Sequence, residues 1–531
     1  MSDFILSSNY FKSNASELGS SSESSSLHDQ IDDSFIEDLL IIQRHMDIIQ
    51  RNKDAFYKKD GTISKRRRSD YSRGPKTKKS DDPWATVPFL QLVSDPNVDD
   101  PSHRQGKEFR RLFRIPFLVF KELLHHCKET GDPIFCYPEY HFTGESNIPI
   151  ELKIFAVLRV LAGGLMFKDG SMIAQYMSEG TLNKFFKEFC AIFRNKFEHQ
   201  YIKVLEGDDF LRSSNIYARL GLPGAVGSID DTFVGPWDGC PSNLQNVMKG
   251  DKGKGLLYEV VVDHCRRCLS VEGGYFGTVN DKCSVKYSKI VKALKNNEFY
   301  QEYSYKIRTG DGLNDFIELS SYYLISDGGY LDWPCIICGF PPDADPLKFK
   351  FTDWIESVRK DVECFFGILK RRFRWLKCPT NIQEKCDIDN AFVTCCIINN
   401  MILDHDGLDR LWEDNVNWKT LSPNDDDEDV NDSDNDYDTD IETQSYGPVE
   451  QENNILEPIT VGSLVDPDDI IDHDRASTSK LRYLLANHLH RVYKRRELQW
   501  PRTRLEIHKK YNIIPRINFP FGEEIVEEFW K

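Results

Sequence analysis

The sequence lacks a long hydrophobic run. None of its apolar stretches reaches the roughly 18 residues at which a membrane-spanning helix becomes the first explanation. Its first residues, MSDFILSSNY, have neither a charged start nor the apolar stretch of a secretory signal. We therefore expect no membrane partner and no export of this chain.

Cysteine is present, but it lacks the spacing of a disulfide or zinc framework. The 14 cysteines are spread over 531 residues, and several lie in apolar segments such as 391–398, so we expect buried thiols. Two C-x-x-C pairs occur, Cys265/Cys268 and Cys335/Cys338. They lie much farther apart than the two halves of a compact zinc ribbon. We expect no structural zinc, with a zinc site as the less favoured alternative.

Positive charge is in the minority, because 68 Lys and Arg stand against 85 Asp and Glu and give a net charge of −17. The charges are segregated along the chain. Segment 58–79 holds ten Lys or Arg and two Asp, whereas segment 425–442 holds eleven acidic residues. Such a basic segment is typical of a nuclear-import signal, a nucleic-acid-binding arm, or both, and a solvated tail is the alternative. The negative total therefore does not exclude DNA, and we expect the protein in the nucleus, with or without a cytoplasmic pool.

Composition and hydrophobic spacing divide the chain into five regions. The predicted regions are a mostly disordered arm at 1–105 that contains the basic segment, a helical region at 106–205, an α/β region at 222–405, an acidic disordered linker at 406–475 and a C-terminal helical segment at 476–515.

The helical region contains a pattern like a helix-turn-helix. A short helix near 170–177, a turn at 178–180 and a second helix from about Thr181 match the shape of that motif. In a helix-turn-helix the second helix enters the major groove of DNA. The exposed candidates for DNA binding on this helix are Thr181, Asn183, Lys184 and Lys187. The alternative is that these helices only buttress the α/β region.

Three acidic residues lie in contexts that suit metal ligands. Asp230 in GSIDDTFVG and Asp327 in YYLISDGGY each interrupt a short β-branched or aromatic run near a strand end. Glu363 lies in a long helical pattern within 353–377. That pattern repeats apolar residues every three or four positions, namely Ile355, Val358, Val362, Phe366, Leu369, Phe373 and Leu376.

Carboxylates arranged in this way suit a pair of Mg²⁺ ions, or Mn²⁺ in their place. Two ions roughly 3.5–4 Å apart activate a water or a 3′-hydroxyl and stabilise the leaving oxygen in phosphodiester chemistry. Asp230 would bridge both ions, while Asp327 and Glu363 would each hold one. The plain structural alternatives are that Asp327 starts a turn and that Glu363 pairs with Arg359 on the same helical face. An acid/base hydrolase with paired carboxylates is a weaker alternative.

The helix that carries Glu363 is also rich in cations. Beside a metal site they would neutralise DNA phosphates and position the strand without reading its sequence. The alternative is a solvated helix face whose last turn complements the helix dipole. The candidates are Arg359, Lys360, Lys370, Arg371 and Arg372.

These motifs occur in an order that resembles a known family. The order GSID, SDGGY and RKDVECFFGILKRRF, with a W-D-x-C-P segment at 237–241, resembles the DDE transposases of the PIF/Harbinger superfamily. Within it, the plant- and protist-type group has strands and a turn similar to 256–285. The resemblance covers roughly 107–405, with a weaker match at 476–501.

The resemblance implies an RNase H-like catalytic core, a mixed sheet flanked by helices, after an N-terminal all-helical domain. It places the metal-binding triad on Asp230, Asp327 and Glu363, with two divalent ions. It favours Asp230 over Asp231, because the acid of the family follows the apolar residue of GSI directly. Asp231 and Asp281 are candidates for contacts behind the metal ligands, and a helix N-cap is the favoured role of Asp281.

The resemblance also implies an activity. It indicates a divalent-metal-dependent DNA endonuclease and strand transferase that acts on the ends of a mobile element in double-stranded DNA. Homo-oligomerisation on DNA and a separate Myb-like DNA-binding helper protein are expected with it. The alternative is a domesticated descendant that binds DNA or protein without cleaving.

Overall fold

The computed structural model describes residues 87–138, 147–172, 177–245, 249–250, 253–279, 281–296, 298–312, 314–342, 345–407, 418–420, 449–450 and 467–501. All of them belong to the second of two compact units, Met1–Lys76 and Thr77–Lys531. The predicted basic segment at 58–79 and the acidic stretch at 425–442 lie outside the described residues.

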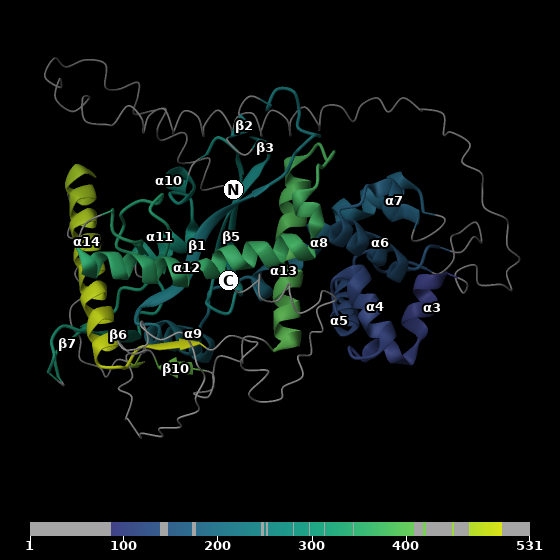
Figure 1. The fold of residues 1–531 in the computed structure, drawn as a ribbon. Coiled ribbons are helices and arrows are strands. Elements are labelled where there is room, and N and C mark those ends of the chain that lie inside the picture. Colours follow the sequence, from purple (N-terminus) through teal and green to yellow (C-terminus); the bar gives the residue numbers. More distant parts are fainter. Residues whose placement is uncertain are drawn as a thin grey trace, which may run out of the picture. The chain divides into compact units, whose positions relative to one another are not determined.

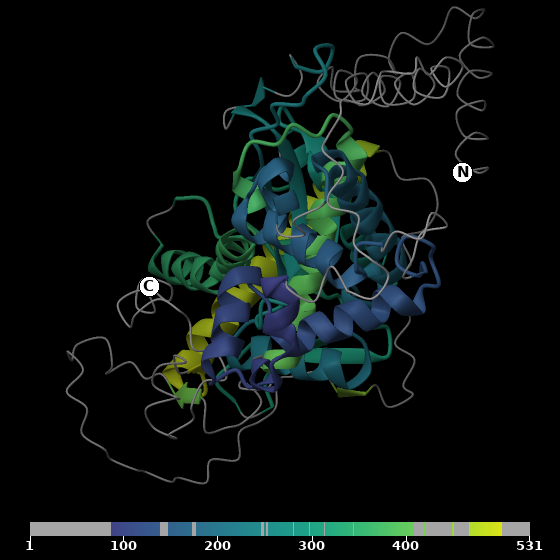
Figure 2. The same ribbon diagram turned by 90° about the vertical axis from the view of Figure 1, so that its right-hand side faces the viewer.

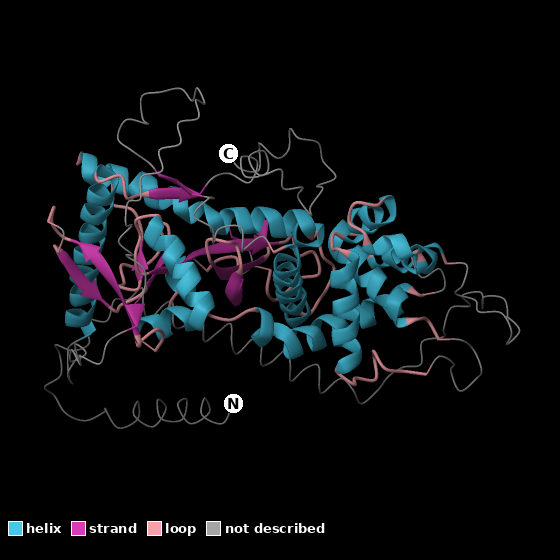
Figure 3. Cartoon of the chain, turned by 90° about the horizontal axis from the view of Figure 1, so that it is seen from below, coloured by secondary structure: helices cyan, strands magenta, loops and turns pink. Residues whose placement is uncertain are grey.

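A mixed five-stranded sheet forms the centre of the α/β region. Its order is β5-β4-β1-β8-β9, with bounds Cys268–Phe276, Leu256–Val262, Ala225–Val234, Tyr323–Ile325 and Ile336–Ile337. β1, β4 and β5 pair antiparallel, whereas β8 pairs parallel with β1 and β9. The apolar runs AVGSI and LLYEVVV are almost entirely buried, as expected of central strands covered on both faces. The predicted α/β class is confirmed as a mixed sheet flanked by helices (Figure 3).

Helix α12, Pro346–Arg372, packs against β1 and β4. Asp345 fixes its start by accepting a hydrogen bond from the Leu347 amide at 2.9 Å, and a proline in the first turn has the φ that a helix needs. The side chains of Val362 and Phe365 are fully buried. Phe366, which the spacing placed in the buried stripe, is only half-buried. Phe365 and Phe366 both fit the spacing of three or four residues from Val362 to Leu369, and in the structure Phe365 is the one that faces the core.

Further helices and short strands surround the sheet. α9 packs against β1, and α13 packs against β5 (Figure 1). Their bounds, with those of the smaller elements, are α9 Gly207–Arg219, α10 Asp281–Ser284, α11 Lys289–Lys295, η4 Arg374–Lys377, α13 Lys385–Asp406, β2 Lys249–Gly250, β3 Gly253–Lys254, β6 Tyr303–Arg308 and β7 Phe316–Leu319.

The W-D-x-C-P segment docks on the chain that leads into α13. The indole nitrogen of Trp237, a buried residue, donates to the Ile382 carbonyl oxygen at 2.6 Å. The Gly239 amide donates to the Thr380 carbonyl oxygen at 2.9 Å. The segment therefore ties the end of β1 to the start of α13.

The N-terminal part is helical, as the spacing predicts. Its helices are α3 Pro88–Ser94, α4 Arg104–Phe113, α5 Phe117–Glu129, α6 Ile150–Gly163, α7 Phe167–Ser171 and α8 Glu179–Tyr201, with the 3-10 turn η2 Pro96–Asp99. The rings of Phe109, Phe113, Phe120 and Phe155 contact one another in the core of this part. α8 lies along α13, so these helices continue into the α/β region.

The C-terminal helix begins before the predicted helical segment 476–515 and ends within it, at Lys494. α14 spans Pro467–Lys494 and so begins inside the predicted linker, before the expected start at 476. It packs against α12 (Figures 1 and 2). β12, Gln499–Pro501, then pairs with β10, Trp418–Thr420, while β11, Val449–Glu450, extends the β6–β7 pair. The segment after the linker is therefore a structural part of the α/β region.

One described helix is long and apolar enough to cross a membrane by length and composition alone. It is α13, and 78% of its apolar window is buried inside the protein. This burial is typical of a core helix.

The burial of α14 gives a test of its role. We predict that Leu485→Ala lowers the free energy of unfolding by about 2–5 kcal/mol, because the Leu485 side chain is fully buried in the main core. Tyr483→Ala, at a position that is 51% exposed on the same helix, should change it by less than about 0.5 kcal/mol. Denaturant unfolding of the full chain measures both, and equal effects would show that α14 does not contribute to the core.

Candidate functional site

Asp230 lies on the central strand and faces α12. Its side chain is 20% exposed, and its Oδ1 accepts a hydrogen bond from the Asp231 amide at 2.7 Å. Burial raises the pKa of Asp230 to about 6; the neighbouring carboxylates Asp327 and Glu363 add to this rise, and Arg359 opposes it. The three predicted acids are thus close enough to affect one another electrostatically.

Asp327 reaches the site through the parallel pairing of β1 and β8. Ser228 on β1 stands opposite Ile325, the last residue of β8. Two residues later, Asp230 is still within β1, whereas Asp327 lies in the turn that follows β8, so both acids come just after the end of the parallel pairing. The Gly329 amide donates to Asp327 Oδ1 at 2.9 Å, so the turn expected of Asp-Gly-Gly also forms and orients the carboxylate.

Glu363 enters the site from α12, and its side chain is 49% exposed. Arg359, one turn earlier, binds Glu363 Oε1 through Nη2 at 2.7 Å and Asp230 Oδ2 through Nη1 at 3.1 Å. Its Nε donates to Glu356 Oε2 at 2.9 Å. The helical pairing of Glu363 with Arg359 is therefore present, and the same guanidinium reaches across to the strand acid.

The donor set fits a hard divalent cation. The Arg359 guanidinium already places a positive charge between the carboxylates of Asp230 and Glu363, and carboxylate oxygens are the ligands that Mg²⁺ prefers. Within the described residues, no group of three or more His, Cys, Asp or Glu side chains stands close enough to hold a metal ion, and this includes both C-x-x-C pairs. Closing the three acids around an ion requires Arg359 to leave.

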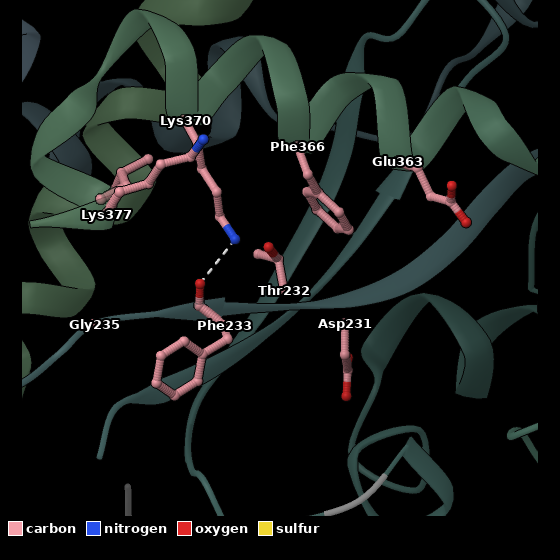
Figure 4. Close-up of a pocket in the computed structure, with 9 residues that line it drawn as sticks. Asp231, Thr232, Phe233, Gly235, Glu363, Phe366, Lys370 and Lys377 are labelled. Carbon is pink, nitrogen blue, oxygen red and sulfur yellow. Dashed lines mark hydrogen bonds between the residues drawn. The ribbon is translucent and has the colours of Figure 1, made fainter. Parts of the chain in front are cut away.

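Asp231 lies outside this group. Ser284 at the end of α10 donates to Asp231 Oδ2 at 3.0 Å, and Figure 4 shows the Asp231 side chain on the side of the strand away from Glu363. Alternation along β1 gives this result, because neighbouring strand residues point to opposite faces. Asp281 is the first residue of α10, and its side chain is not among the described ones.

Comparison with known proteins agrees with the order of these motifs. Residues 199–409 match the family model described as "Plant transposon protein". The curated "Protein ALP1-like" of Arabidopsis thaliana is 22% identical over 316 residues, which cover 56% of this chain and 71% of that protein. Both matches support a relationship of this part of the chain to the Harbinger-type transposases. No solved structure matches the chain.

The five cations predicted on α12 have different surroundings in the structure. Lys360 and Arg371 are exposed. Arg359 lies among the acids, with 12% of its side chain exposed. Lys370 donates to a main-chain carbonyl oxygen of β1 at 2.8 Å, and Arg372 donates to an amide side chain of α13. Burial lowers the pKa of Arg372 to about 10.

The predicted recognition helix is α8, which begins at Glu179 after the N-cap Ser178, rather than at Thr181. Its apolar face is buried, and its main partner is α13. Of the cations expected to face DNA, Lys187 pairs with an aspartate of α13 at 2.8 Å, whereas Lys184 is 76% exposed. The packing supports the buttress interpretation for the buried face.

Thr181 and Asn183 lie on the first turns of the same helix. Thr181 is exposed, and its hydroxyl and amide both contact the Ser178 hydroxyl, at 2.8 and 3.1 Å. Asn183 is half-buried. An exposed face that includes Thr181 and Lys184 therefore remains beside the buried one.

Sequence reasoning missed a buried polar cluster behind Glu363. Asp361, on the inner face of α12, forms an ion pair with His264, and Arg266 approaches the same carboxylate at 3.4 Å. The pair joins α12 to the turn between β4 and β5. The sequence did contain a signal for this cluster. Asp361 lies next to Val362, on the face of the helix that is buried, and a buried acid needs a partner.

The raised pKa of Asp230 predicts a dependence of stability on pH. In the metal-free folded protein Asp230 keeps its proton up to about pH 6, whereas the unfolded carboxyl titrates near 3.8. Between these values the folded state holds more protons, so the free energy of unfolding should fall as the pH rises, by on the order of 2 kcal/mol.

Denaturant unfolding at several pH values in chelator measures this loss. Asp230→Asn should remove that part of the pH dependence, while Asp353→Asn, at an exposed position of α12, should leave it in place. The assignment to Asp230 fails if the Asp230→Asn curve keeps the slope of the unsubstituted protein.

Proposed function

We propose that this chain is a Harbinger-type DDE transposase, a divalent-metal-dependent DNA endonuclease and strand transferase that acts on element ends in double-stranded DNA. The observation that carries the proposal is that Arg359 links Asp230 on β1 to Glu363 on α12, while Asp327 follows β8, the parallel neighbour of β1. The sheet supports an RNase H-like core, because it is antiparallel on one side of the strand that carries the first acid and parallel on the other.

Each acid has a distinct task in this proposal. Asp230 lies nearest the centre and would bind both ions, while Asp327, oriented by the Gly329 amide, and Glu363 would complete one ion each. When bound, Mg²⁺ or Mn²⁺ supplies Lewis-acid activation of a water or 3′-hydroxyl and stabilises the leaving oxygen. The half-exposed Glu363 carboxylate lies on the solvent side, where DNA would arrive.

The exposed cations of the same helix would hold the DNA backbone. Lys360 and Arg371 flank Glu363 along α12 and are open to solvent. Contacts from such residues neutralise phosphates and fix the position of the strand without reading its bases. The exposed face of α8, with Lys184, is a second place for such contacts.

The proposal includes the partners that accompany this superfamily. Joining two element ends calls for two copies of the chain on DNA, and a Myb-like helper protein would supply sequence recognition. Nuclear location follows from the DNA substrate and from the basic segment at 58–79.

A domesticated, non-cleaving descendant is the second candidate. The observation that favours it is the Arg359 guanidinium, which neutralises two of the three acids without any metal. In that case the chain would bind DNA or protein through its cationic surfaces and leave phosphodiester bonds intact.

Cleavage of plasmid DNA tests the main proposal. Supercoiled plasmid carrying the candidate element ends should be nicked or cut in Mg²⁺ or Mn²⁺, with the Myb-like helper added where needed. Asp327→Asn and Glu363→Gln should each lower the rate by roughly 100-fold or more, because each removes a group that acts in the chemical step. DNA binding should persist in both variants.

Asp353→Asn is the matched control, since it removes an exposed carboxylate from the helix that carries Glu363. It should cleave like the unsubstituted protein. Binding of the same DNA without any metal-dependent cutting by the unsubstituted protein would favour the domesticated descendant.

Arg359 gives a test that does not depend on cleavage. Arg359→Gln should raise the affinity of the metal-free protein for Mn²⁺ by about 10-fold or more, because the variant no longer neutralises Asp230 and Glu363. Titration calorimetry without DNA measures it. Arg371→Gln, which removes an exposed cation from the same helix, should leave the affinity nearly unchanged. An equal or lower affinity in Arg359→Gln would mean that Arg359 does not compete with a metal ion.

A further inference from the structure

A hollow of about 520 Å³ lies beside the acid group, between the end of β1, the second half of α12 and η4. Glu363 stands at one end of it, so one of the three proposed metal ligands borders the hollow. Its lining residues are Asp231, Thr232, Phe233, Gly235, Glu363, Phe366, Lys370, Leu376 and Lys377. The metal chemistry uses Glu363 from this set and assigns no role to the rest.

The hollow presents an aromatic ring to solvent. Phe366 is half-buried because its neighbour Phe365 fills the core position on α12. In Figure 4 the Phe366 ring points from the helix toward β1, between Glu363 and Lys370 and above Thr232. A flat apolar surface between polar groups is what a nucleic-acid base stacks on.

The charges around the ring are arranged by sign. Lys377 on η4 is exposed at the end of the hollow opposite Glu363. The Lys370 ammonium group donates to the Phe233 carbonyl oxygen at 2.8 Å and keeps positive charge on the same side. Asp231 also lines the hollow, and its carboxylate lies on the side of β1 away from Glu363. Positive charge at the Lys377 end therefore favours an anionic group there. At the Glu363 end a phosphate is favoured only together with the divalent cation that Glu363 would bind.

Phe366 follows Glu363 by three residues, which is roughly 4.5 Å of helix rise, so the ring lies within one helical turn of the acid. A volume of about 520 Å³ is within the range of pockets that hold small organic ligands.

We propose that this hollow binds one unstacked nucleotide of the DNA strand under attack, next to the scissile phosphate. Its base stacks on Phe366, and its far phosphate contacts Lys377. The inference rests on the proposed function for the neighbouring phosphate, but base binding itself needs no metal and no cleavage.

The test compares two DNA probes in chelator with the full chain. One is a blunt duplex, and the other is the same duplex with a four-thymidine 3′ tail. The ratio of their affinities cancels binding of the shared duplex by the cationic surfaces, and Phe366→Ala, which removes no charge, separates stacking from the attraction of the extra phosphates in the tail. We expect the tailed duplex to bind more tightly, and we expect Phe366→Ala to lose roughly 5- to 150-fold of that preference while blunt-duplex affinity stays unchanged.

Three further variants sharpen the test. Phe366→Trp should keep the preference for the tailed duplex, because the larger indole ring can still stack on a base. Phe349→Ala removes a ring that is 70% exposed near the start of the same helix and should have no effect. Lys377→Ala should reduce the salt dependence of tailed-duplex binding by about one charge.

The proposal is overturned if the unsubstituted protein shows no preference for the tail, or if Phe366→Ala keeps it. It is overturned equally if Phe366→Ala weakens both probes to the same extent. If the metal-dependent cleavage test fails, the two affinities can still be interpreted, because binding is measured without metal.

Discussion

The packing of α12 across β1 determines where every group of the candidate site lies. The helix buries Val358, Val362 and Phe365 toward the sheet, and this phase turns Glu363 toward the edge where Asp230 and Asp327 meet. Buried apolar contacts of this kind are non-directional, so they set the distance between helix and sheet. Which residues of the helix are apolar sets its rotation, and the polar contacts are consistent with that rotation. A shift of the helix by one residue would replace Glu363 at the site with a neighbour.

Electrostatics explains why the acids remain together in the absence of a cofactor. Three carboxylates at one sheet edge repel one another, and the raised pKa of Asp230 records both that repulsion and its burial. The Arg359 guanidinium offsets it by binding Asp230 and Glu363 at once. The same residue that stabilises the metal-free site therefore occupies the space that an ion would need. Behind it, the pairing of Asp361 with His264 anchors the helix on its inner side.

The sequence predicted the acids, their elements and the local contacts of Asp327 and Glu363, but not the contact between helix and strand. Asp230 and Asp327 were found because an acid in a β-branched run has few structural reasons to be there, and Glu363 because the family order supported it. The reach of Arg359 to Asp230 depends on tertiary packing between residues far apart in the chain. The sequence also could not predict which of Phe365 and Phe366 packs into the core, since both positions satisfy helical spacing. The burial of α8 against α13 was left open as an alternative for the same reason.

Diffraction from crystals soaked in Mn²⁺ is the most direct test of the central claim that these three acids form a metal centre. The account predicts anomalous peaks between Asp230, Asp327 and Glu363, with the Arg359 side chain displaced from both carboxylates. Crystals that show no peak at this position, with Arg359 still bridging Asp230 and Glu363 at high Mn²⁺, would contradict it and leave an ion-paired structural site in its place.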